Sequence, residues 1–143
     1  MDDDFAPRPV ASWYMLAAVA SLLVMGAFCI LYLMHVFADP ALMPLDQRAA
    51  YEATPDWVIG AFGVGAWVGF AGALLLVMRR RLAEPAMLVS LAGMAVWLAG
   101  SLLVARLREV MSATDLVVVI AALAIVWTIY WFARHSRMRG WTL

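Results

Sequence analysis

Four long runs of apolar residues, separated by short polar segments, dominate the pattern of this chain. They cover residues 13–37, 57–78, 85–105 and 116–132, and none contains Asp, Glu, Lys or Arg. A helix that crosses the hydrocarbon core needs about 20 mostly apolar residues, because lipid offers its backbone no hydrogen-bond partner. The runs therefore predict an all-α membrane protein with four transmembrane helices. Their short connections predict an up-down-up-down bundle of antiparallel neighbours, formed as a single domain.

Polar residues at the edges of these runs predict where the helices begin. Thr54, Pro55 and Asp56 fit an N-cap, a proline at the first helical position and an acid in the first turn. Pro85 is expected to open the third span in the same way, and Thr114 to cap the fourth. We further expect a short interfacial helix over 44–52, within the longest connection, because its apolar positions repeat at helical spacing.

The placement of arginine predicts the orientation of the four spans. The N-terminus, the 79–84 loop and the C-terminal tail share one side, which carries seven of the ten arginines. The positive-inside rule assigns that side to the cytoplasm, so both termini are expected inside and the 38–56 loop outside. The seven are Arg8, Arg79, Arg80, Arg81, Arg134, Arg137 and Arg139. The adjacent Arg79, Arg80 and Arg81 are also expected to attract anionic lipid headgroups.

Composition supports a lipid-facing surface and excludes several classes of function. Of the 143 residues, 66% are hydrophobic and 14% charged, against about 45–50% and about 25% in soluble domains. Zero net charge argues against a nucleic-acid partner, which would require a basic stripe. Cys29 is the sole cysteine, so the chain cannot form an internal disulfide or a thiolate metal cluster.

The second span carries small residues at every fourth position, which form one smooth ridge along a helix. Such a ridge lets two helix backbones approach closely in lipid, where close packing drives association. It could serve packing within this bundle, or form a seam for a second copy or for another membrane protein. The ridge consists of Ala61, Gly65, Gly69 and Ala73.

Two tryptophans and two histidines are the remaining candidates for a binding role. Trp67 and Trp97 lie near the middle of their spans, as core filler or as the lining of a cavity, and Ser101 is a candidate acceptor for the Trp97 indole. His35 and His135 fall near opposite membrane surfaces, about 30 Å apart. They therefore cannot share a haem or a metal. Ligation of a haem or pigment by a single histidine is the option that is left.

The absence of catalytic patterns argues against an enzyme. The spans contain none of the buried charges that ion-coupled transport usually needs, and no nucleophile–base pair, paired carboxylates or phosphate loop appears. The leading interpretation is a non-enzymatic accessory or assembly subunit that packs against other membrane proteins, or against its own copies, through the second span. The alternative is a carrier for a small, neutral, sugar-like solute that acts as an oligomer.

Residues 43–94 resemble a known group of proteins in the order of several short motifs. The motifs are Tyr51 before Pro55-Asp56-Trp57, the runs 63–69 and 72–81, then Ala83, Pro85 and Ser90-Leu91. The resemblance is to small four-helix bacterial membrane proteins that often carry the label "sugar transporter". It implies the four-helix fold, the bacterial inner membrane and a solute path. Where the group carries Asn and Asp in the first helix, this chain has Met-Gly-Ala-Phe-Cys at 25–29.

Overall fold

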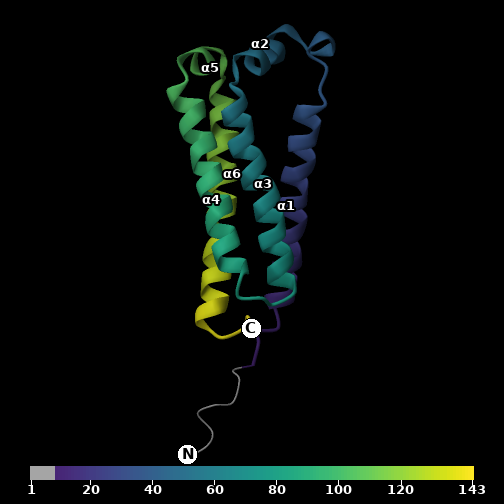
Figure 1. Cartoon of the computed structure of the whole chain (residues 1–143), viewed down its shortest axis with the longest axis vertical. Coiled ribbons are helices and arrows are strands. Elements are labelled where there is room, and N and C mark those ends of the chain that lie inside the picture. The colour runs from purple at the N-terminus through teal and green to yellow at the C-terminus, as the bar shows by residue number, and fades with distance from the viewer. Residues whose placement is uncertain (1–8) are drawn as a thin grey trace, which may run out of the picture.

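The computed structural model describes residues 9–143 of the chain, which form helices and connecting turns without a strand. The four longest helices are each long and apolar enough to cross a membrane. The predicted all-α, four-helix membrane fold is therefore confirmed (Figure 1). These helices are α1 (Tyr14–Val36), α3 (Asp56–Val77), α4 (Ala83–Leu103) and α6 (Ala113–Met138), and the short ones are η2 (Pro40–Leu42), α2 (Leu45–Ala53) and α5 (Ala105–Val110).

The two ends of the bundle differ in what covers them. Helices α2 and α5 lie together at one end, which we call the α2 end (Figure 1). The 79–84 turn and the C-terminal residues lie at the other, which we call the tail end. Helix α2 confirms the short helix expected within the longest connection. Six of the seven arginines assigned to one side follow residue 78 and flank the tail end, whereas Arg8 lies outside the described residues.

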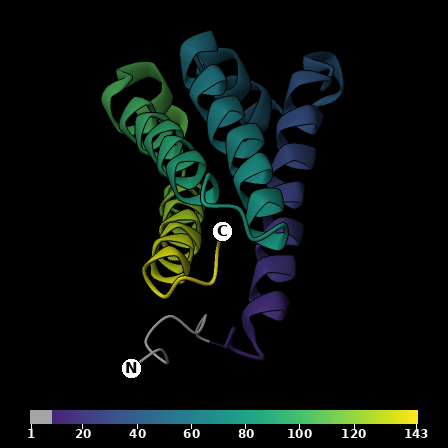
Figure 2. The same ribbon diagram turned by 60° about the horizontal axis from the view of Figure 1, so that its bottom comes forward.

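The four long helices are arranged as a row rather than a closed ring. Helix α3 packs along both α1 and α4, and α4 packs in turn along α6 (Figures 1 and 2). The outer members of the row, α1 and α6, meet at the tail end, where the rings of Tyr14 and Phe132 are 5.4 Å apart. The flank between α1 and α6 therefore lacks a covering helix toward the α2 end.

Close packing against α3 brings side-chain donors onto its backbone. The Tyr14 hydroxyl of α1 donates a 2.7 Å hydrogen bond to the carbonyl of Leu76. From the other side, the Ser90 hydroxyl of α4 donates a 2.6 Å hydrogen bond to the carbonyl of Gly65. Tyr14 is almost fully buried, so its ring serves packing at the tail end of the bundle.

Two predicted helix caps are replaced by neighbouring residues. The hydroxyl of Thr54 donates to the carbonyl of Ala50 and so ends α2 instead of capping α3. Helix α6 is capped by Ser112, not by Thr114, because Ser112 and Asp115 form a reciprocal capping box. The Thr54 hydroxyl thus bonds backward to α2, whereas the Ser112 hydroxyl accepts from the Asp115 N–H in the first turn of α6.

Other boundaries also differ from those expected at the tail end. Helix α4 begins two residues before Pro85, which becomes its third residue. Helix α6 continues beyond residue 132 to Met138. This extra length lets Arg137 bind Glu84 at 2.6 Å, so α6 is tied to the start of α4.

Residues 140–143, which we call the C-terminal clasp, fold back onto the turn after α3. Gly140 ends α6 in a left-handed conformation with φ of 71°. The Leu143 N–H then donates to the Arg79 carbonyl at 2.6 Å, and the Arg81 N–H donates to the Leu143 carbonyl at 2.9 Å. The Arg79 side chain donates to the carbonyl of Trp141 at 3.0 Å. The clasp closes the tail end of the bundle.

Candidate functional site

The glycine ridge is used for packing within the chain. Its members are Ala61, Gly65, Gly69 and Ala73. A Cβ added to Gly65 would lie 2.7 Å from the Met94 sulfur, and one added to Gly69 would lie 2.5 Å from the Ser90 hydroxyl oxygen. Helix α4 therefore packs against the ridge within the chain. A further role of the ridge as a seam for a partner stays a prediction.

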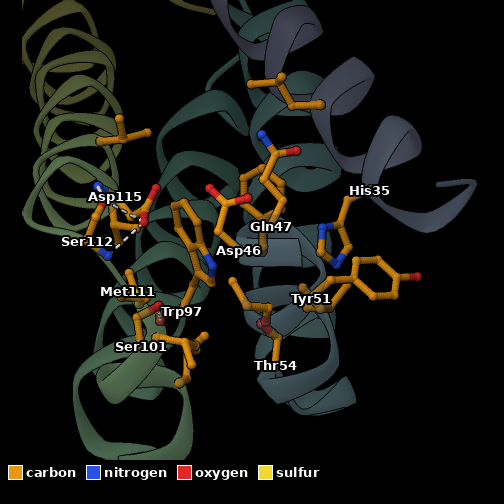
Figure 3. A pocket seen from close by; sticks show the side chains of 18 of the residues that line it. His35, Asp46, Gln47, Tyr51, Thr54, Trp97, Ser101, Met111, Ser112 and Asp115 are labelled. Atoms are coloured by element: carbon orange, nitrogen blue, oxygen red, sulfur yellow. Dashed lines mark hydrogen bonds between the residues drawn. The ribbon is translucent and has the colours of Figure 1, made fainter. Parts of the chain in front are cut away.

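A pocket of about 650 Å³ opens at the α2 end of the bundle. Side chains from all four long helices line it, together with α2 and the α5 segment (Figure 3). We call it the α2 pocket. Its lining includes Leu31, His35, Asp46, Gln47, Ala50, Tyr51, Thr54, Ile59, Phe62, Trp97, Ser101, Leu107, Met111, Ser112, Asp115, Val118 and Val119.

Polarity changes with depth along the walls of the α2 pocket. Three of the long helices each place a polar residue near the α2 end and an apolar or aromatic residue about one turn deeper. The mouth is therefore polar, and the floor lies deeper in the bundle, among apolar side chains of the long helices. These pairs are His35 over Leu31 on α1, Ser101 over Trp97 on α4, and Asp115 over Val118 and Val119 on α6.

The floor of the pocket is aromatic. The rings of Phe62 and Trp97 lie 4.6 Å apart at an interplanar angle of 32°. The Ser101 hydroxyl donates to the Trp97 carbonyl at 2.9 Å, rather than accepting from the indole. Trp67 does not line the pocket and is 45% exposed on the outer face of α3. The structure therefore supports a cavity role for Trp97 and places Trp67 elsewhere.

Helix α2 forms one wall of the pocket mouth without being buried itself. None of its residues is buried, although several of them face the pocket. Its side toward α1 is held by the Tyr51 ring, which lies 4.7 Å from the His35 ring at 35°. Figure 3 shows this pair on one side of the pocket and Ser112 with Asp115 on the other.

The electrostatic character of the mouth is negative. Asp46 and Asp115 line it, and none of the lining residues is an arginine. Asp115 accepts hydrogen bonds from the Ser112 N–H at 2.8 Å and hydroxyl at 2.7 Å. Arg48, the basic residue of α2, is bound instead by Glu52 at 2.8 Å. The hydrogen bond to that carboxylate raises the pKa of the Arg48 guanidinium.

The two histidines occupy opposite ends of the bundle. His35 lies at the mouth of the α2 pocket. His135 lies at the tail end, where its ring stacks on Trp131 at 5.2 Å and meets the Trp141 ring edge-on. Within residues 9–143, no group of three His, Cys, Asp or Glu side chains is arranged to hold a metal ion. Ligation of a haem or pigment by either histidine stays a prediction.

Comparisons with known proteins add no information on the role of the α2 pocket. No protein-family model, curated protein or solved structure matches this chain. The similarity to proteins labelled as sugar transporters accordingly stays an expectation. Asp46, Tyr51 and Asp115 were not among the residues expected to bind a ligand. Asp115 directly precedes the fourth apolar run, and this position could have marked it. Asp46 and Tyr51 lie within the short helix of the longest connection, and only the fold brings them to the pocket.

Proposed function

We propose that this chain is a non-enzymatic membrane protein that binds a small amphiphilic molecule in the α2 pocket. The observation that supports this proposal is the polarity of the pocket, whose mouth is polar and whose aromatic floor lies among the spans. Its volume falls within the range of about 300–1,000 Å³ that is usual for small-molecule sites. A molecule with an apolar body and a polar head matches this arrangement.

The open flank between α1 and α6 supports entry of the ligand from the lipid. These helices meet at the tail end and leave the pocket side uncovered. Deeper passage is blocked, because Trp141 of the clasp packs against Trp13 and Tyr14 at the tail end. This geometry favours capture of a membrane-dissolved molecule over free flow of solute across the bilayer.

The assembly role and the sugar-like solute expected from the sequence stay predictions that can be compared with this proposal. In the assembly role, the glycine ridge that packs against α4 within the chain would also have to contact a partner. A carrier for a neutral solute would use the same pocket and the same Trp97. Both alternatives are separated from amphiphile capture by the binding measurement below.

A matched pair of tryptophan variants tests the proposed function. We expect purified protein in phosphatidylcholine nanodiscs to bind triphenylmethanol, which has one hydroxyl head and three apolar rings, in a saturable manner. Trp97→Leu should weaken binding about tenfold, which equals about 1.4 kcal/mol, because it removes the aromatic floor. Trp67→Leu, on the outer face of α3, should leave the dissociation constant within about twofold. Equal losses in both variants, or no saturable binding above empty nanodiscs, would contradict the proposal.

We also propose that the tail end faces the cytoplasm of a bacterium and that the α2 end lies outside its inner membrane. Two exposed leucines provide the test, Leu45 on α2 and Leu82 in the turn before α4. A membrane-impermeant maleimide should label Leu45→Cys in intact spheroplasts, and should label Leu82→Cys only after lysis. The native Cys29 is buried and gives little background. Labelling of both variants from the same side would disprove this topology.

A further inference from the structure

We propose that the α2 pocket selects amphiphiles with a cationic head over neutral and anionic ones. This inference rests on the proposed function and names the ligand class of the same pocket. It is drawn from a cavity in which two carboxylates, an aromatic floor and an absence of arginine coincide among the described lining residues.

The two carboxylates of the mouth retain free capacity to accept hydrogen bonds. Both contacts that Ser112 makes with Asp115 end on Oδ2, so Oδ1 accepts none within residues 9–143. Asp46 lies in the first turn of α2 and forms no ion pair among the described residues. In the view of Figure 3, the Trp97 ring stands between these two acids.

No arginine among the described residues of the pocket wall balances the negative charge of its two carboxylates. The only arginine of α2 is Arg48, which is paired with Glu52 and is absent from the lining. The other arginines near the α2 end, Arg106 and Arg108, belong to α5, whose contribution to the pocket is apolar. An anionic head would therefore meet two carboxylates without a compensating charge, and burial of an unpaired charge is costly.

The aromatic floor adds to the preference for a cation. Trp97 lines the pocket together with Asp46 and Asp115, and the negative charge of an aromatic ring face attracts a nearby cation. This attraction strengthens as the cation loses contact with water. A neutral polyol would gain hydrogen bonds at the mouth but neither of these charge-dependent contributions. The geometry therefore ranks a cation first, a neutral molecule second and an anion last.

Tetraphenylphosphonium and tetraphenylborate provide a decisive comparison, because they share four phenyl rings and differ in the sign of the charge. In phosphatidylcholine nanodiscs, we expect tetraphenylphosphonium to bind at least about tenfold more tightly than triphenylmethanol. Tetraphenylborate should show no saturable binding above empty nanodiscs. The double variant Asp46→Asn/Asp115→Asn should lose the cation preference and keep its affinity for triphenylmethanol. Glu109→Gln, a carboxylate near the same end that does not line the pocket, should change neither.

Each result bears on one of the two proposals. If tetraphenylborate binds as tightly as tetraphenylphosphonium, or if the double variant keeps the preference, charge selection is wrong. Triphenylmethanol binding that depends on Trp97 would then still support amphiphile capture. Failure of all three probes would remove both proposals. Should the double variant unfold, Asp46→Asn alone carries the test, because α2 has no buried residue and Asp46 caps no other helix.

Discussion

Replacement of Gly93 by alanine is expected to destabilise the bundle by about 1–3 kcal/mol, the usual cost of overpacking. Gly93 of α4 faces the backbone of α3, and an added Cβ would lie 2.9 Å from the amide nitrogen of Gly65 and 3.0 Å from the carbonyl oxygen of Ala61. Backbone atoms cannot rotate away as a side chain can. The two helices must therefore separate locally, which weakens the most extensive helix pair of the fold.

Gly60→Ala is the matched control for this prediction. A Cβ at Gly60 meets no heavy atom within 4 Å, so the only effect is the better helix propensity of alanine, worth up to about 1 kcal/mol. Unfolding in mixed micelles with increasing dodecyl sulfate, followed by circular dichroism, should therefore shift in opposite directions for the two variants. Equal stability of Gly93→Ala and the wild type would show that α3 and α4 are farther apart than described.

Replacement of Trp141 by alanine is expected to cost about 3 kcal/mol, as for other buried aromatic residues. The indole of the clasp is 8% exposed. Its ring lies 5.7 Å from that of Trp13 and 6.0 Å from that of Tyr14, both edge-on. Loss of the ring removes the packing that joins α1 to the end of α6. The midpoint of the same dodecyl sulfate titration measures the loss.

The control is Trp127→Ala, because Trp127 lies on the same helix as the residues preceding the clasp but is 58% exposed. Its removal should change the midpoint little. Proteolysis by trypsin gives a second measure, since Arg139 and Arg81 flank the clasp contacts. Trp141→Ala should be cleaved faster at these sites than Trp127→Ala. Equal cleavage and equal midpoints would contradict a closed tail end.

The four spans could be predicted from the sequence because their signal is local. Each is a run of apolar residues without charge, and the physics of the bilayer leaves helices as the structure for such a run. The caps were harder, because Ser112 and Thr114 are both good N-cap residues and lie two positions apart. Which one acts is decided by the reciprocal bond to Asp115, and that bond depends on where the preceding turn places the chain.

The binding pocket could not be predicted, because its walls come from segments far apart in the sequence. In lipid, the inward and outward faces of a helix can be equally apolar, so the pattern does not mark which face is buried. Trp67 and Trp97 looked equivalent for this reason, although one faces outward and the other lines the pocket. The row arrangement was equally hidden, since short connections are compatible with both a ring and an open row of helices.

The row arrangement also has a consequence for biosynthesis. Helix α1 packs along its length against α3, and its other aromatic contacts are with Tyr51 of α2, Phe132 of α6 and Trp141 of the clasp. The ribosome must therefore add about 40 residues after α1 before α3 is complete, which takes about 2–8 s at about 5–20 residues per second. During this interval α1 has no complete long helix of this chain to pack against. Helix α1 has no Asp, Glu, Lys or Arg between Tyr14 and Val36, so its exposure to lipid during this interval does not carry the free-energy cost of a buried charge.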